Sequence, residues 1–176
     1  AYHFTTLSPN LGVVKYYDNS FVIADIPGII EGASEGKGLG LEFLKHIERT
    51  RILLHIIDIA GVDGRDPLED FEIINNELKK YNAEVAQSPQ IIVLNKIDLL
   101  FSEEDKSKLY EFKEKYSKKY KIVEFSAATR VGVDELLNTI IDEIKKLPPK
   151  EREVSEIYEL DKRDYTSIEI TRDDDG

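Results

Sequence analysis

The sequence predicts an α/β fold with a doubly wound, mostly parallel sheet that is covered by helices on both faces. From residue 21 onward, short apolar runs alternate with longer segments of helical periodicity, which is typical of βαβ units. Residues 52–59 and 91–94 are mostly aliphatic, as expected of buried strands. Polar side chains follow directly behind several of these runs, at the position where open α/β sheets bind ligands.

The first part of the chain predicts a β-hairpin, then an irregular segment and a helix. Residues 11–15 and 21–25 are β-rich runs joined by a polar turn around Asp18. Residues 28–40 contain five of the ten glycines, too many for a regular element. Residues 41–49 place apolar side chains at spacings of three and four, which predicts a helix.

Strands and helices then alternate to the end of the main domain. Pro67 suits the first turn of a helix, Ser102 suits a helix cap, and Pro148 ends the last helix. We expect strands at residues 52–59, 91–94 and 122–125, and helices from residue 67, at residues 102–119 and at residues 133–147.

Composition limits the compartments and partners. The 176 residues suffice for about one domain, and 41% hydrophobic content suffices for a core. The chain has no cysteine, which excludes disulfides and cysteine metal sites and suits a cytoplasmic protein. No apolar stretch approaches the roughly 20 residues that span a bilayer. With a net charge of −11, we expect no membrane association and no direct DNA binding. Any approach to RNA would require a local basic patch or a further domain.

The most informative motif is Asn95-Lys96-Ile97-Asp98, directly behind the run at residues 91–94. An aspartate carboxylate accepts two hydrogen bonds at once, which matches the adjacent N1–H and 2-amino donors of guanine. Adenine offers no such pair of donors. Asn95 can donate and accept, and the aliphatic stem of Lys96 can lie along a base. The motif therefore predicts guanine binding.

A second polar motif, Asp25-Ile26-Pro27-Gly28, ends the second strand of the hairpin. A carboxylate at this position can hold Mg²⁺ through water, because Mg²⁺ keeps much of its hydration shell. The backbone N–H of Gly28 can approach a γ-phosphate. Taken alone, Asp-x-x-Gly is a common turn, so its value comes from its place at a strand end.

Two weaker candidates complete the set. Phe4-Thr5-Thr6-Leu7-Ser8 precedes the hairpin, and the hydroxyl of Thr6 is a suitable direct ligand for Mg²⁺ while its backbone N–H can meet the γ-phosphate. Taken alone, this segment would be interpreted as a loop.

Ser126-Ala127-Ala128 follows the strand at residues 122–125. Backbone N–H groups there could reach the guanine O6. By contrast, we interpret His55 as a core histidine with a backbone partner, and Asp58, which opens a second Asp-x-x-Gly pattern, as the end of a strand.

In their order along the chain, these four sites resemble the switch I, switch II and two base-recognition motifs of P-loop GTPases. Residues 2–12, 25–33, 36–40 and 46–51 resemble the bacterial Obg (CgtA) family more closely. Residues 170–176 resemble the start of that family's C-terminal domain.

The resemblance implies the P-loop NTPase (GTPase) fold. Residues 1–147 would form an Obg-type GTPase domain from switch I onward, residues 148–156 a linker, and residues 157–176 the beginning of a small C-terminal α+β domain. The sequence contains no Gly-x-x-x-x-Gly-Lys followed by Ser or Thr, the loop that grips phosphate.

In the family this loop lies shortly before the position of Tyr2, together with the first strand and helix. The first strand belongs between the strands at residues 21–25 and 52–58. We therefore expect unpaired strand edges at that place, and an isolated chain that is weakly folded and inactive.

The function implied by the resemblance is Mg²⁺-dependent binding of GTP and GDP with slow GTP hydrolysis. It also implies a role in assembly of the large ribosomal subunit, in stress response and in the cell cycle, in a cytoplasmic monomer. Ile29 follows Gly28, where many regulatory GTPases place a water-orienting glutamine, so no catalytic residue is assigned. A nucleotide-independent binding module and an ATPase of the same broad fold are the alternatives.

Overall fold

The computed structural model describes residues 10–25 and 49–149. Several sequence-based expectations fall outside these residues. They are the switch residues Phe4, Thr5, Thr6, Leu7 and Ser8, the residues Ile26, Pro27 and Gly28, the helix at residues 41–49, most of the linker, and the tail at residues 157–176.

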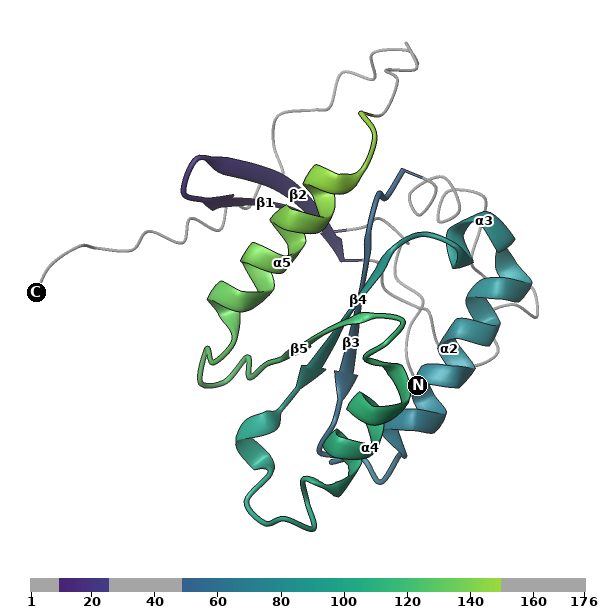
Figure 1. Ribbon diagram of the computed structural model, residues 1–176, viewed down its shortest axis with the longest axis vertical. Helices are drawn as coiled ribbons and strands as arrows, with labels where there is room; N and C mark the ends of the chain where they lie inside the picture. The colour runs from purple at the N-terminus through teal and green to yellow at the C-terminus, as the bar shows by residue number, and fades with distance from the viewer. Residues whose placement is uncertain (1–9, 26–48, 150–176) are drawn as a thin grey trace, which may run out of the picture.

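A three-stranded parallel sheet forms the centre of the main domain (Figure 1). Its strands are β3 (Leu53–Asp58), β4 (Gln90–Asn95) and β5 (Lys121–Glu124), in the order β3-β4-β5. All three strands confirm the predicted runs. In this register Asp58 lies beside Asn95, so the polar ends of two strands meet at one edge of the sheet.

Helices cover both faces of this sheet (Figure 1). On one face lie α2 (Pro67–Tyr81) and α4 (Ser107–Tyr116), and on the other lies α5 (Val133–Lys146). The central strand β4 is buried along its apolar length because Ile92 and Leu94 face α2 and α4, while Ile91 and Val93 face α5. Such two-sided burial is characteristic of parallel sheets, and it explains the unbroken apolar run.

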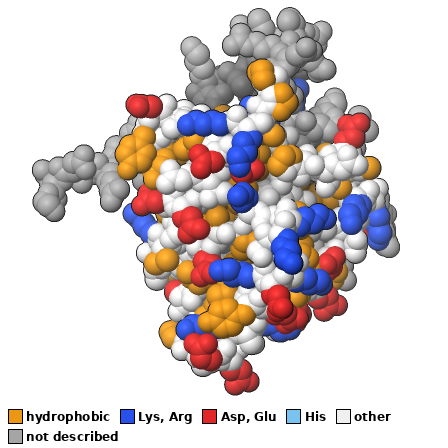
Figure 2. Space-filling view, in the orientation of Figure 1, with side chains coloured by type: hydrophobic (Ala, Val, Ile, Leu, Met, Phe, Trp, Pro, Cys, Tyr) orange, Lys and Arg blue, Asp and Glu red, His pale blue; other side chains and the backbone are white. Residues whose placement is uncertain are grey.

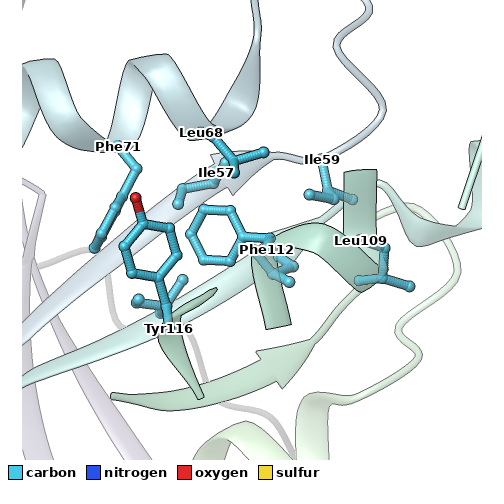
Figure 3. Close-up of a cluster of buried hydrophobic side chains, with 9 residues drawn as sticks. Ile57, Ile59, Leu68, Phe71, Leu109, Phe112 and Tyr116 are labelled. Carbon is cyan, nitrogen blue, oxygen red and sulfur yellow. The ribbon is translucent and has the colours of Figure 1, made fainter. Parts of the chain in front are cut away.

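Aromatic rings fill the core between β3, α2 and α4. The rings of Phe71 and Tyr116 have centroids 4.6 Å apart, and those of Phe71 and Phe112 are 5.3 Å apart, both in edge-to-face arrangements. Figure 3 shows these side chains converging with Ile57 and Leu68. The cluster fixes α2 and α4 against the sheet and so fixes the loops at the sheet's edge.

The hairpin forms a separate two-stranded sheet, β1 (Asn10–Tyr16) paired with β2 (Asn19–Asp25). The predicted hairpin is therefore confirmed. Within the described residues β2 does not pair with β3. The hairpin contacts the main domain through Phe21, which packs against the core beneath α5, and through the Tyr16 hydroxyl, which donates to Asp134 Oδ1 at 3.1 Å.

The structure corrects one helix boundary. The predicted helix at residues 102–119 begins only at Ser107 and ends at Tyr116. Asp105 Oδ2 accepts from the backbone N–H of Ser102 at 2.8 Å, and Ser102 Oγ accepts from the N–H of Asp105 at 3.1 Å. This reciprocal pair is a capping box, as expected of Ser102. The turn that it caps closes with the bond from the Lys106 N–H to the Ser102 carbonyl at 3.2 Å, before α4 begins.

Two short elements were not predicted from the sequence, α3 (Ala83–Ala86) and the 3₁₀ helix η2 (Ile97–Leu99). Asn82 ends α2 and caps α3, because its Oδ1 accepts from the N–H groups of Glu84 and Val85. Among the described helices, none is long and apolar enough to cross a membrane.

Candidate functional site

The candidate site lies at the carboxyl ends of β3, β4 and β5. Asn95 is the last residue of β4, and η2 begins two residues later. The chain turns sharply between them because Lys96 adopts the left-handed conformation, with φ 70°. This conformation is uncommon for a residue other than glycine, and it brings Lys96 and Asp98 to the end of the sheet.

Lys96 is held by the neighbouring strand. Its Nζ donates to Asp58 Oδ2 at 2.7 Å, and the other carboxylate oxygen, Oδ1, accepts from the backbone N–H of Ala60 at 3.1 Å. The pKa of Lys96 lies above its ordinary value, chiefly because of the hydrogen bond to Asp58. The ammonium group therefore stays charged and in a fixed position.

Asp98 is held by the loop after β5. Ser126, which is fully buried, donates from Oγ to Asp98 Oδ1 at 2.5 Å. The same Oγ accepts from the backbone N–H of Thr129 at 3.1 Å. A hydroxyl bonded on both sides has one orientation, so the Asp98 carboxylate is oriented before any ligand arrives.

The loops after β4 and β5 are tied together at two further points. Asn95 Oδ1 accepts from the N–H of Ala127 at 3.1 Å, and the N–H of Ile97 donates to the carbonyl of Phe125 at 3.3 Å. The N–H of Ser126 donates to the carbonyl of Val131. Of the backbone groups expected to meet guanine O6, those of Ser126 and Ala127 are thus engaged within the protein here, and Ala127 and Ala128 are exposed.

Gly132 allows the loop after β5 to return to α5. It caps the helix with φ 84°, and a Cβ at this position would lie 2.1 Å from the carbonyl oxygen of Glu124. Only glycine combines this conformation with so close a backbone approach. The turn therefore keeps residues 126–131 against the end of β4.

Asp25, the described residue of the predicted Asp-x-x-Gly motif, is exposed at the end of β2. The structure thus brings Asn95, Lys96, Asp98 and Ser126 together at one sheet edge and puts Asp25 at the end of the separate hairpin. Within residues 10–25 and 49–149, no group of three or more acidic, histidine or cysteine side chains could hold a metal ion.

Sequence reasoning missed two side-chain contacts of this site. Asp58, interpreted as a strand end only, is the ion-pair partner of Lys96, and the side chain of Ser126, not only its backbone, contacts Asp98. The register signal for Asp58 was present, because it ends the strand next to the one that Asn95 ends.

His55 is buried as predicted. The expectation of a backbone partner is not met at Nε2, which has no hydrogen-bond partner within the described structure. Burial lowers the pKa of His55 from 6.5 to about 4, so the side chain is neutral at physiological pH.

Comparison with known proteins assigns the chain to a family. Residues 1–96 match the family model described as 50S ribosome-binding GTPase. The chain is 55% identical to GTPase Obg of Clostridium novyi over 88% of its own length and 37% of that protein. It is 50% identical to GTPase Obg of Anoxybacillus flavithermus over 99% of its length and 42% of that protein. The chain thus spans about two fifths of the curated relatives that it matches.

Solved structures agree. A variant of Era from Aquifex aeolicus bound to GDP and AlF4⁻ is 28% identical with a TM-score of 0.57, over 83% of this chain and 46% of that one. Era in complex with MgGDPNP and a segment of 16S ribosomal RNA is 29% identical with the same TM-score, over 78% and 45%. The chain therefore has the P-loop GTPase fold, it is similar to the GTPase Obg proteins over most of its length, and it belongs to the 50S ribosome-binding GTPase family.

Proposed function

We propose that the protein containing this chain binds GTP and GDP with Mg²⁺ and hydrolyses GTP slowly. The observation that carries the proposal is the oriented Asp98 carboxylate, fixed by the Ser126 hydroxyl at 2.5 Å beside a lysine that is itself fixed by Asp58. Family membership supports the same activity.

Guanine selection follows from the acceptors of Asp98. Each carboxylate oxygen has two lone pairs, so the bond from Ser126 to Oδ1 leaves both oxygens able to accept. The N1–H and 2-amino groups of guanine would fill these positions as charge-assisted bonds, each worth about 1.5–3 kcal/mol. Adenine has an acceptor at N1, which would face the carboxylate and be rejected. The stem of Lys96 would lie along the base.

The phosphate end would use residues from the two switch segments. Thr6 would ligate Mg²⁺ through its hydroxyl, Asp25 through water, and the N–H of Gly28 would meet the γ-phosphate. These donors fit the ion, because Mg²⁺ prefers hard oxygen ligands and keeps several waters, and Asp25 is exposed to water at a strand end. The ion would neutralise charge on the phosphates. The remaining nucleotide contacts are assigned to Phe4, Thr5, Leu7, Ser8, Ile26 and Pro27.

Hydrolysis is proposed to be slow for a reason visible in the sequence. Ile29 follows Gly28, and an aliphatic side chain cannot hydrogen-bond the attacking water. Phosphoryl transfer depends on positioning of that water and on charge neutralisation. A partner or another residue would then have to supply the positioning, which suits a molecular switch better than a fast enzyme.

The cellular role is proposed from the family. The family model is described as ribosome-binding, and one structural neighbour is Era in complex with a segment of 16S ribosomal RNA. We propose that the nucleotide state controls association with the large ribosomal subunit during its assembly, in a cytoplasmic monomer with links to stress response and the cell cycle. Residues 1–147 would be the GTPase domain, 148–156 a linker and 157–176 the start of another domain.

Titration with a fluorescent GDP analogue tests guanine recognition, on the chain preceded by its natural upstream residues. We expect Asp98→Asn to weaken GDP about tenfold or more and to improve the affinity for xanthine nucleotides, because an amide N–H can donate to the xanthine 2-oxo group. Asp142→Asn, an exposed carboxylate on α5, makes the same charge change and should alter neither affinity.

Three outcomes would count against the proposal. An unchanged GDP to XDP preference in Asp98→Asn would remove Asp98 from base recognition. Preference for ADP over GDP would favour the alternative hypothesis, an ATPase of the same broad fold. No nucleotide binding at all would favour a binding module that acts independently of nucleotide.

A further inference from the structure

An open hollow of about 650 Å³ lies at the amino-terminal edge of the parallel sheet, the end opposite to Asp98. Four elements surround it: the end of α2, the segment from α3 into β4, the turn from α4 into β5, and the end of α5. We call it the basic hollow. Its lining residues are Lys79, Ala86, Gln87, Ser88, Pro89, Gln90, Ser117, Lys118, Lys119, Tyr120, Lys121, Glu143 and Lys146.

The lining is strongly unbalanced in charge. It contains five lysines and a single carboxylate, Glu143. Glu143 is already paired with Lys146 at 2.8 Å. No described carboxylate forms an ion pair with Lys79, Lys118 or Lys121, and all three are exposed. Their charges are therefore available to a ligand.

This imbalance contrasts with the rest of the molecule. The chain carries a net charge of −11, and the lysines of α4 mostly have partners: Lys108 pairs with Asp66 at 2.7 Å, and Lys113 pairs with Glu124. In the space-filling view several blue side chains lie close together on the right of the visible face (Figure 2). Like charges repel, and Lys79, Lys118 and Lys121 have no ion-pair partner among the described residues, so the hollow favours an anionic ligand.

We infer that the basic hollow binds the phosphate backbone of RNA. Its lysines stand on three of these four elements around a concave surface, which suits a strand of phosphates spaced along a curved backbone. Ser88, Gln87 and Ser117 add neutral hydrogen-bonding groups for phosphate and ribose oxygens. An anionic membrane would instead require a flat or protruding patch with apolar side chains to insert, and the lining offers only Ala86, Pro89 and the half-buried Tyr120.

The inference deepens the proposed association with the ribosome and rests on it, since ribosomal RNA is the polyanion that such a partner presents. It does not rest on guanine recognition, because the hollow and Asp98 lie at opposite ends of the same strands. Nucleotide and RNA would therefore contact separate surfaces of the domain.

Fluorescence anisotropy with a short labelled RNA hairpin tests the inference on the full chain at several salt concentrations. We expect Lys118→Glu combined with Lys121→Glu to weaken RNA binding about tenfold or more. Each lost phosphate contact should also reduce the slope of log K against log salt by about 0.9. The single variant Lys121→Glu should give an intermediate loss.

A matched control distinguishes the site from general charge. Lys15→Glu makes the same charge change at another exposed strand lysine, in β1, and should leave RNA affinity within about twofold of wild type. Circular dichroism of each variant checks the fold. Binding of the fluorescent GDP analogue, measured on the upstream-extended chain, should be the same in Lys121→Glu and wild type.

Each outcome bears on the inference. Equal losses for Lys121→Glu and Lys15→Glu would overturn it, as would absence of RNA binding by the wild type. Tighter binding to vesicles containing phosphatidylserine, or to polyglutamate, would also overturn it and assign the hollow to a membrane or an acidic protein. RNA binding that depends on Lys118 and Lys121 supports the inference. Failure of the intact protein to sediment with 50S subunits would count against the proposed association with the ribosome, but not against RNA binding by the hollow.

Discussion

The two ends of the parallel sheet handle charge in opposite ways. At the carboxyl end, Lys96 is paired with Asp58, and Asp98 accepts from a buried hydroxyl. At the amino end, Lys118 and Lys121 project into water without ion pairs in the described structure. The first arrangement fixes a few polar atoms before a small rigid ligand arrives, which lowers the ordering cost of binding. The second suits a polyanion, which needs charge density more than exact geometry.

If the carboxyl end depends on fixed geometry, the largest effect should come from the residue that allows its loop to close. We expect Gly132→Ala to destabilise the chain by about 4 kcal/mol, because an added Cβ would lie 2.1 Å from the Glu124 carbonyl oxygen at a φ of 84°. Urea denaturation followed by circular dichroism measures the loss.

Gly12→Ala provides the control for that substitution. A Cβ on Gly12 meets nothing within 4 Å, so its stability should stay within about 0.5 kcal/mol of wild type. Equal stabilities for the two variants would show that the loop after β5 tolerates other conformations. The carboxyl end of the sheet would then not differ from the amino end in the rigidity of its geometry.

The second largest effect should be a loss of stability at acidic pH. It should arise at His55 in β3. His55 stacks on Phe71, with ring centroids 5.0 Å apart, and its burial lowers its pKa from 6.5 to about 4. Because the folded chain binds the proton less readily than the unfolded chain, this contribution to stability is complete above pH 6.5. It is lost as pH falls from 6.5 toward 4. At pH 4 the free energy of unfolding has decreased by about 3 kcal/mol through this group.

Replacing the histidine isolates its share of this loss. Carboxylates also titrate in the same range, so the comparison is between wild type and His55→Leu in urea denaturation at each pH. The difference in unfolding free energy between the two should change by about 3 kcal/mol across the window. Parallel curves would mean that His55 is protonated without cost. Hydrogen exchange should show β3 opening first, because His55 lies in that strand.

The sequence was sufficient to predict the elements that depend on local pattern. Apolar runs predicted the five strands of the described residues. Pro67 marked the start of α2 because Asp66 caps it and proline suits the first turn. The start of α4 was predicted too early, since Ser102 and Asp105 form a capping box on a turn that closes before α4 begins. A capping box uses the same residue types whether or not the helix continues from its turn, so local sequence could not place the start of α4.

The sequence was sufficient to predict that polar residues gather at the end of β4, but not the side-chain contacts that hold them. Asn95, Lys96 and Asp98 are consecutive enough to form a motif, and the position of Ser126 behind a strand indicated a role. The hydrogen bond from the Ser126 hydroxyl to Asp98 joins residues 28 positions apart, and the ion pair from Lys96 to Asp58 joins residues 38 positions apart. Contacts of this range depend on strand register, which only the folded sheet establishes.

The smallest effect that still discriminates concerns Asp58. Asp58→Asn keeps an oxygen that can accept from Ala60 but removes the charge that holds Lys96, so we expect guanine nucleotide affinity to fall about fivefold, or roughly 1 kcal/mol. Asp63→Asn removes an exposed carboxylate that influences Lys96 only through its charge, and it should change affinity less than twofold. The pKa of Lys96, followed by NMR of its Nζ group, should fall in Asp58→Asn because its principal partner is lost. If the pKa falls and nucleotide affinity does not, the ion pair stabilises the sheet edge alone, and pre-organisation of the guanine site then rests on Ser126.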